Sequence, residues 1–271
     1  MSRRRRGAAV VLALAMVAAA CSDDGAGSSP DETEPGEERD ELALADDGNT
    51  GVELDGEPLL EPSAGSDRDA PVAWRDAPYE VEVKGGGTYI GHELLSSPSE
   101  AEIPWIDMAS DAGTPTVAAE QATDHSLSVT VRAPEGSGAT ALSVSFACGA
   151  DERFHGFGAQ SWATEHRGET VPIWVVEQGL GKITPDTPEP PPSVLGEPYD
   201  SYAPIPFMMS SRGYGVSYSG YDYATFELCT EEYPDTWRLE VWADELTFDV
   251  VTGSEPLTLV EHYTEPVSYT H

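Results

Sequence analysis

Basic residues are scarce in this chain of 271 residues. Its 14 lysines and arginines face 49 aspartates and glutamates, which gives a formal net charge of −35. A surface of that sign repels the phosphates of nucleic acids and the headgroups of anionic membranes. The composition therefore argues against nucleic acid as a partner and favours solubility.

The chain also lacks an apolar run that is long enough to span a bilayer stably. The apolar segment from Ala8 to Ala20 follows Arg3 to Arg6 and ends at Cys21, which is the order of a signal peptide with a lipobox. We expect residues 1–21 to be a lipoprotein signal peptide, with acyl chains on Cys21 that contribute about 0.8 kcal/mol per buried methylene. The protein would then be exported and lipid-anchored to the bacterial cell envelope, in the periplasm or at the cell surface, and would touch the membrane only through that lipid. The alternative is a plain secretory signal in which Cys21 is incidental.

Cysteine is nearly absent from the rest of the chain. Only Cys148 and Cys229 follow Cys21, and export would place both in an oxidising compartment. A disulfide between them closes a loop for which chain entropy gives about 4.5 kcal/mol as an upper figure. The alternatives, two buried free thiols or a pair too far apart to join, stay open.

Familiar catalytic motifs are missing as well. The chain has no Gly-x-Ser-x-Gly elbow, no His-Glu-x-x-His, no Cys-x-x-Cys and no phosphate-binding loop. Its six histidines, at positions 92, 125, 155, 166, 262 and 271, do not have the spacing of metal ligands. We therefore expect neither a metal nor a cofactor.

Residues 22–70 have the composition of a linker. They are rich in Asp, Glu, Gly, Ser and Pro and contain few large apolar side chains. Such a segment cannot bury enough surface to offset its chain entropy, so we expect a disordered acidic linker. As a flexible coil it would span roughly 40 Å on average. The alternative is an acidic tail that binds a partner.

From Pro71 onward the pattern is that of β-strands. Apolar and polar residues alternate in several short segments, with turn residues between them. The expected strands cover residues 79–83, 88–90, 127–131, 142–146, 205–209, 214–218, 223–228, 237–242 and 246–250. Because no long helical period separates them, the sequence predicts an all-β fold, an antiparallel β-sandwich.

Two other segments differ from this pattern. Ser254 can cap a short C-terminal helix in which Leu257, Val260 and Tyr263 share a face. The segment from Thr184 to Tyr199 contains six prolines, which predict a long extended surface loop.

Several sequence blocks resemble the N-terminal part of glycoside hydrolase family 31, in the branch of α-glucosidases and sulfoquinovosidases. These are residues 152–160 with their Gly-Phe-Gly core, the Arg167-Gly168 pair, the Glu-Gln-Gly-Leu-Gly-Lys block at 177–182, and residues 206–216. The resemblance covers about residues 79 to 265. It implies a galactose-mutarotase-like supersandwich that packs on a catalytic (β/α)₈ barrel in the family, so we place the family 31 sandwich domain at residues 71–265.

In the family, one sandwich loop reaches over the barrel mouth and helps to form a sugar subsite. By position, that loop begins here at Glu177 and Gln178, which are the predicted substrate-binding residues for a saccharide. The alternative for Glu177 is an ion pair with Lys182 or Arg167 at the base of the loop. We expect Arg167 to brace this loop. Gly156, Gly158, Gly179 and Gly181 are expected to be turn residues with positive φ. Trp162 and Trp174 can stack on sugars, but in a sandwich a tryptophan usually belongs to the core.

The acid pair of a retaining glycosidase, two carboxyl groups about 5–5.5 Å apart, is not recognisable in this chain. In the family both acids lie on barrel strands. Trp105-Ile106-Asp107-Met108 has some likeness to the nucleophile motif, but Ala109-Ser110 follow it and it lies upstream of the sandwich blocks. We therefore assign no catalytic residue.

The C-terminal residues 266–271 depart abruptly from the family pattern, and we interpret them as a truncation artefact. The first hypothesis is a sandwich domain of a family 31 retaining α-glycosidase, inactive alone, with an exposed apolar patch near Ile205 to Met209 or the terminal helix. The alternative is a stand-alone carbohydrate-binding surface lipoprotein. A third, an isolated mutarotase-like epimerase using His155 and His166, rests on fold analogy alone.

Overall fold

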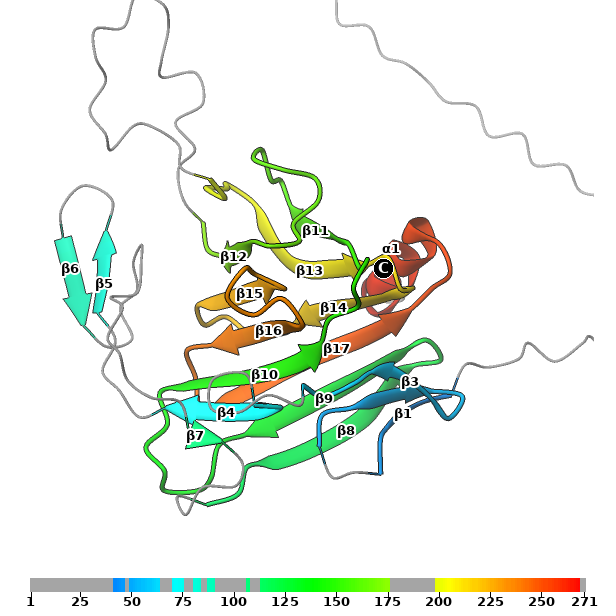
Figure 1. The fold of residues 1–271 in the computed structure, drawn as a ribbon, viewed down its shortest axis with the longest axis horizontal. Helices are drawn as coiled ribbons and strands as arrows, with labels where there is room; N and C mark the ends of the chain where they lie inside the picture. Colours follow the sequence, from blue (N-terminus) through cyan, green and yellow to red (C-terminus); the bar gives the residue numbers. More distant parts are fainter. Residues whose placement is uncertain are drawn as a thin grey trace, which may run out of the picture. The chain divides into compact units, whose positions relative to one another are not determined.

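Two antiparallel β-sheets share one apolar core (Figure 1). The computed structural model describes residues 41–46, 49–63, 70–75, 80–83, 87–90, 106–107, 113–175 and 198–268. The first sheet has the strand order β12-β15-β16-β10-β4-β7, and the second has the order β11-β13-β14-β17-β9-β8. The predicted all-β antiparallel sandwich with one short C-terminal helix is confirmed.

The strands expected from alternation are all present among the described residues. The first sheet contains β4 (Val72–Arg75), β7 (Ile106–Asp107), β10 (Ala141–Ala147), β12 (Thr170–Ile173), β15 (Ala224–Leu228) and β16 (Thr236–Val241). The second contains β8 (Thr116–Thr123), β9 (Ser126–Arg132), β11 (Phe154–Gly158), β13 (Pro204–Ser210), β14 (Tyr214–Tyr218) and β17 (Glu245–Thr252). A separate hairpin pairs β5 (Glu80–Val83) with β6 (Gly87–Ile90).

The core lies between the two sheets because alternate residues of each strand point inward. Phe146 of β10 stacks on Trp237 of β16, with ring centroids 4.6 Å apart. The same Phe146 meets the edge of Phe248 from β17 in the second sheet, at 5.9 Å. All three side chains are fully buried, so aromatic contacts join the layers.

The C-terminal helix α1 (Pro256–Ser268) covers part of the outer face of the second sheet. Leu259 packs with Phe207 and Val251, and the Tyr263 ring stacks on Phe207 with centroids 4.1 Å apart. The buried stripe therefore consists of Leu259 and Tyr263, whereas Leu257, which we expected to share the face of Tyr263, is 68% exposed. The helix also continues past Glu265, the expected end of the domain.

Exposed apolar side chains occur where the first hypothesis placed them. Ile205 on β13 and Leu257 and Val260 on α1 are all exposed large hydrophobic residues. The neighbouring Phe207 and Met209 are instead covered by the helix, because they belong to its apolar contact with the sheet.

The predicted disorder of residues 22–70 is wrong for residues 41–63. β1 (Leu42–Leu44), β2 (Val52–Leu54) and β3 (Glu57–Leu60) form a three-stranded antiparallel sheet. Leu42, Val52 and Leu60 join the main core, because a few regularly placed apolar residues suffice to bury one face. The chain then attaches to β10, where the Ser63 amide donates to the Ser145 carbonyl at 2.9 Å. Residues 22–40 lie outside the described part of the chain.

Substitution of Leu60 tests whether this small sheet belongs to the core. We expect Leu60→Ala to lower the free energy of unfolding by about 2–4 kcal/mol, because the side chain is buried and leaves a cavity. Urea unfolding followed by tryptophan fluorescence measures the change. The matched control Glu57→Ala alters an exposed residue of the same strand and should stay within about 0.5 kcal/mol of the wild type. Equal stabilities of the wild type and Leu60→Ala would contradict the assignment.

Candidate functional site

The proline-rich segment leaves and rejoins the sandwich at one place. Glu177 and Gln178, the predicted sugar contacts, lie outside the described residues, but both ends of the segment are held. Val175 and Ser201 form an isolated parallel bridge, and the buried Ser201 hydroxyl donates to the carbonyl of Ala159 at 3.0 Å. We call residues 158–160, 175 and 201–205 the loop base. It lies beside the end of β11, the edge strand of the second sheet.

The Gly-Phe-Gly block shapes this edge as a β-bulge. The pairing of β11 with β13 shifts register between Gly156 and Gly158, and φ is 117°, 64° and 75° at residues 156, 157 and 158. A Cβ atom at Gly156 would lie 2.3 Å from the carbonyl oxygen of Phe207, and one at Gly158 would lie 2.4 Å from that of Ala203. These glycines have the expected positive φ, but they are bulge residues inside a strand and not turn residues.

The bulge directs Phe157 into the core. Its ring meets Phe226 and His166 edge-on, with centroids 5.1 and 5.2 Å away. The His166 Nδ1 lies 3.4 Å from the Tyr199 hydroxyl. Burial lowers the pKa of His166, with a further lowering by His155 and an opposing effect of Glu165. Burial also raises the pKa of Tyr199 to about 12.

The two histidines that flank the block do not form an open acid/base pair. His166 is only 1% exposed, so a ligand at the surface cannot reach its ring. The His155 Nδ1 donates to the Thr164 carbonyl at 2.5 Å. The geometry thus gives no support to a mutarotase-like role for these residues.

Exposed apolar side chains gather in the segments that meet at the loop base. Val175 is 64% exposed, Tyr202 is 48% exposed, and Ile205 lies against Gly158. Trp162, in the loop that follows β11, is 60% exposed, so the expectation that it belongs to the core is wrong. Trp174 is half-buried and packs near Tyr223, with centroids 6.2 Å apart. Open aromatic faces of this kind can stack on the C–H face of a sugar.

A buried acceptor lies at the same place. The Gln160 side-chain amide donates through Nε2 to the Phe157 carbonyl at 3.0 Å. Its other polar atom, Oε1, is buried and has no hydrogen-bond partner among the described residues. Such an acceptor is costly unless a donor reaches it, so the loop base has unused capacity for a donor.

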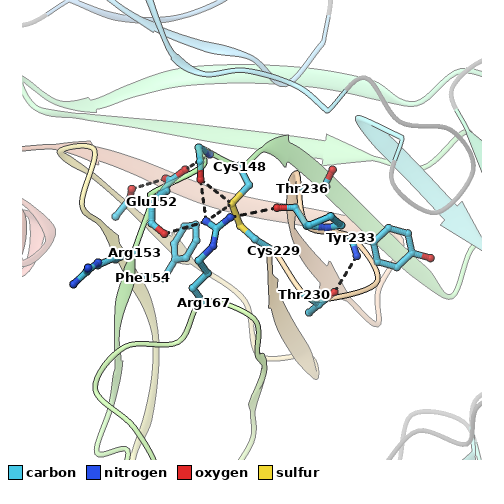
Figure 2. Close-up of a disulfide and its surroundings, with 12 residues drawn as sticks. Cys148, Glu152, Arg153, Phe154, Arg167, Cys229, Thr230, Tyr233 and Thr236 are labelled. Atoms are coloured by element: carbon cyan, nitrogen blue, oxygen red, sulfur yellow. Dashed lines mark hydrogen bonds between the residues drawn. A yellow bond between two sulfur atoms is a disulfide. The ribbon is translucent and has the colours of Figure 1, made fainter.

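Arg167 braces the disulfide (Figure 2). Cys148 and Cys229, for which the sequence left a bridge or free thiols open, are joined in the structure with a Cα–Cα distance of 6.2 Å. The Arg167 guanidinium donates to the carbonyls of Gly149 at 2.9 Å, Glu152 at 3.0 Å and Pro234 at 3.4 Å. Arg167 therefore braces the loops next to the disulfide, whereas the loop at Glu177, which we expected it to brace, lies outside the described residues.

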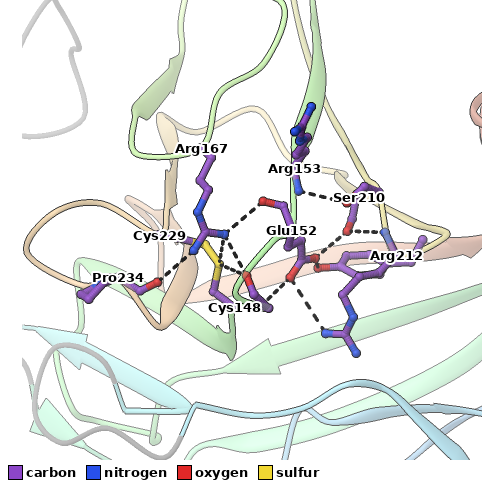
Figure 3. A network of polar contacts seen from close by, with 11 residues as sticks. Cys148, Glu152, Arg153, Arg167, Ser210, Arg212, Cys229 and Pro234 are labelled. Atoms are coloured by element: carbon purple, nitrogen blue, oxygen red, sulfur yellow. Dashed lines mark hydrogen bonds and ion pairs between the residues drawn. A yellow bond between two sulfur atoms is a disulfide. The ribbon is translucent and has the colours of Figure 1, made fainter.

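A buried carboxylate completes this network (Figure 3). Glu152 Oε1 accepts hydrogen bonds from Ser210 Oγ and the Tyr214 hydroxyl, both at 2.5 Å, and Oε2 accepts from the Gly149 amide at 2.8 Å. Arg212 adds a distant positive charge at 3.9 Å. Burial, and then the Glu152 charge, raise the pKa of Tyr214 well above its usual value. Since its oxygens are occupied by protein donors, Glu152 supports the fold and is not a free catalytic base.

The described residues contain no group of three or more His, Cys, Asp or Glu side chains that could hold a metal ion. No described helix is long and apolar enough to cross a membrane. Cys21, the predicted lipidation site, lies among residues 1–40, outside the described part of the chain.

The Tyr214–Glu152 contact predicts a pH-dependent change in stability. Tyr214→Phe should cost about 1.5–3 kcal/mol at pH 7, because the charged acceptor loses a donor. A phenol with a raised folded-state pKa contributes stability that is complete below about pH 10 and is lost as pH rises toward the folded value, since only the unfolded chain then releases the proton. The cost of Tyr214→Phe should therefore shrink above pH 10. Urea titrations at pH 7 and pH 10.5–11.5 measure it.

Tyr221→Phe serves as the control, because the Tyr221 ring is fully exposed. This variant should unfold like the wild type at pH 7. If Tyr214→Phe and Tyr221→Phe have the same stability at pH 7, the buried hydrogen bond to Glu152 contributes nothing.

Sequence comparison gives no relative, since no family model matches the chain and no curated protein is similar to it in sequence. Among solved structures, a GH31 family sulfoquinovosidase from E. rectale, in complex with an aza-sugar inhibitor, superposes with a TM-score of 0.54 and 14% identity. The match covers 83% of this chain but only 34% of that enzyme.

Two further structures are more distant. A GH31 dextranase from Flavobacterium johnsoniae, complexed with glucose, gives a TM-score of 0.38 at 19% identity and covers 55% of this chain and 20% of that one. A GH31 α-xylosidase from a soil metagenome, complexed with xylose, gives 0.36 at 14% identity and covers 79% and 22%. Scores this low carry no weight by themselves. The E. rectale match shows that this chain has the fold of a part of a family 31 glycoside hydrolase, which confirms the resemblance predicted from the sequence at the level of the fold.

Proposed function

We propose that this chain is the sandwich domain of an exported family 31 retaining α-glycosidase and that it presents the loop at Glu177 and Gln178 to a saccharide. The observation that carries the proposal is the loop base, where Val175 and Ser201 hold both ends of the proline-rich segment. Glu177 follows Val175 by two residues, so it starts from an anchored position. A carboxylate there can accept hydroxyl protons of a pyranose in a fixed geometry.

The surroundings of the loop base suit this role. Trp162 and Tyr202 are exposed aromatic side chains on either side of the anchored segment in sequence. Ligand sites for sugars combine aromatic surface with a few polar groups that fix orientation.

We propose that hydrolysis uses residues outside this sandwich. Retention needs two carboxyl groups about 5–5.5 Å apart that are free to meet the substrate. Glu152, the buried carboxylate of the Gly-Phe-Gly block, is saturated by Ser210, Tyr214 and the Gly149 amide. We therefore propose that the acid pair lies in a barrel outside these 271 residues and that the chain alone is inactive. In such an enzyme the substrate is an α-linked glucoside or sulfoquinovoside.

The disulfide supports the proposed location. Disulfides persist in oxidising compartments, and Cys148–Cys229 is the kind of long-range bridge that exported domains carry. Export through the first 21 residues and acylation of Cys21 would then tether the domain to the cell envelope.

Reading the gene beyond codon 271, together with assays of the 271-residue product, tests the proposal. We expect an in-frame barrel, and we expect the product alone to release no sugar from α-glucosides or α-sulfoquinovosides. A stop codon immediately after codon 271 would favour the stand-alone carbohydrate-binding lipoprotein. Robust turnover of an α-linked sugar by the 271-residue product would contradict the proposal.

Glu177→Gln in the enzyme that includes the barrel tests the loop. Loss of a charged hydrogen-bond acceptor should lower kcat/KM by about 10- to 100-fold, corresponding to about 1.5–3 kcal/mol. Glu189→Gln removes the same charge from the same proline-rich segment and should change kcat/KM less than about twofold. Equal losses in the two variants would show that the charge of the loop matters and the specific contact does not.

A further inference from the structure

A hollow lies on the outer face of the second sheet, next to α1. Its volume is about 470 Å³, and residues of β14, β17, β9, β8 and α1 line it. None of the loop-base residues belongs to its lining. Small-molecule sites commonly have volumes of roughly 300–1,000 Å³, so a sugar of one or two rings fits here.

Hydroxyls and one carboxylate form the floor of this hollow. Ser217 of β14 is paired in register with Asp249 of β17, so both side chains lie on the same face of the sheet. Asp249 Oδ2 accepts from Ser219 Oγ at 2.5 Å and lies 3.5 Å from Ser217 Oγ. Among the described residues no donor reaches Asp249 Oδ1. The floor thus keeps an oriented acceptor, held on two rigid strands, for a hydroxyl from outside.

Tyrosines form the walls. Tyr221, in the turn between β14 and β15, is fully exposed, and its ring is free to stack. Tyr263 of α1 is held against Phe207 by the stacked contact at 4.1 Å. The Tyr263 hydroxyl can donate a hydrogen bond, and burial, and then the charge of Asp249, raise its pKa. Aromatic faces beside paired hydroxyl and carboxylate groups suit a pyranose.

The charge of the hollow selects among sugars. The residues that line it include Asp249 and contain no lysine or arginine. The chain as a whole carries −35. Apart from the imidazole of His262, Asp249 is the ionisable group with a charge at neutral pH in this lining, so the hollow suits a neutral sugar and disfavours a sulfonate or phosphate.

We propose that this hollow is a second saccharide site that binds one neutral pyranose unit, with Asp249 as the hydroxyl acceptor and Tyr221 as the stacking platform. It is built on strands and a helix and does not involve Glu177. The sandwich would then hold a sugar chain at a point separate from the loop base.

NMR titration of the 271-residue chain with methyl α-D-glucopyranoside and with maltose tests the site. We expect saturable shifts with a dissociation constant of about 1 mM, confined to the lining of the hollow, which includes the turn at Tyr221. Asp249→Asn and Tyr221→Ala should each weaken binding by about tenfold or more. Glu120→Gln, an exposed carboxylate on β8 outside the hollow, should leave binding unchanged.

Urea unfolding of each variant separates lost binding from lost folding. Glucose 6-phosphate should bind at least about tenfold more weakly than the neutral sugars. Absence of binding by the wild type at tens of millimolar sugar, or wild-type affinity in both Asp249→Asn and Tyr221→Ala, would overturn the proposal. Glu177→Gln should bind normally. If Glu177→Gln abolishes binding and the variants of Asp249 and Tyr221 do not, the sugar binds at the loop. That result would contradict the second site and would agree with the proposed function.

Discussion

The bulge at Gly156, Phe157 and Gly158 sets the edge at which the proline-rich segment leaves the sandwich. Three successive positive φ angles reverse the usual alternation of side chains along a strand. Carbonyl oxygens of β13 and the loop base occupy the space where Cβ atoms at Gly156 and Gly158 would lie. Phe157 is thereby turned inward against Phe226, and the Ala159 amide reaches the Ala203 carbonyl at 3.0 Å. The most recognisable sequence block is therefore conformational, because it fixes where the proline-rich segment leaves the sandwich.

The same block begins with Glu152, which belongs to a polar network that holds one end of the sandwich. Glu152 and Arg167 connect four chain segments, around residues 148–153, 167, 210–214 and 229–236. The groups in this network compensate one another for burial. A buried carboxylate without donors, or buried carbonyls without a cation, would lose their hydrogen bonds to water and gain none in return. The disulfide adds a constraint on the unfolded chain, so polar contacts and chain entropy stabilise the same end.

The sequence predicted the structural features that depend on local periodicity. It missed features that depend on residues far apart in the chain. Leu127–Val131 was predictable because alternation in a half-buried strand is visible in five residues. β1 to β3 were missed because the average composition of residues 22–70 hid a few apolar residues, although Asp55-Gly56, both with positive φ, is a known hairpin signal. The exposure of Trp162 contradicted the usual burial of its residue type. The role of Glu152 depends on Ser210 and Tyr214, roughly 60 residues away, and no local pattern reveals that.

The outer face of the second sheet has an apolar part and a polar part, and this division bears on both proposals. Phe207, Val251 and Leu259 make the part under α1 apolar, whereas Ser217 and Asp249 make the adjoining part polar. A face selected only for packing against another domain would bury apolar side chains throughout, since an unpaired carboxylate in such a contact is costly. The apolar surface suited to a large neighbour is instead on the open side of the helix, at Leu257 and Val260. Leu257 and Val260 do not line the hollow, so a barrel packed on them and a sugar held beside Asp249 would use different residues of α1.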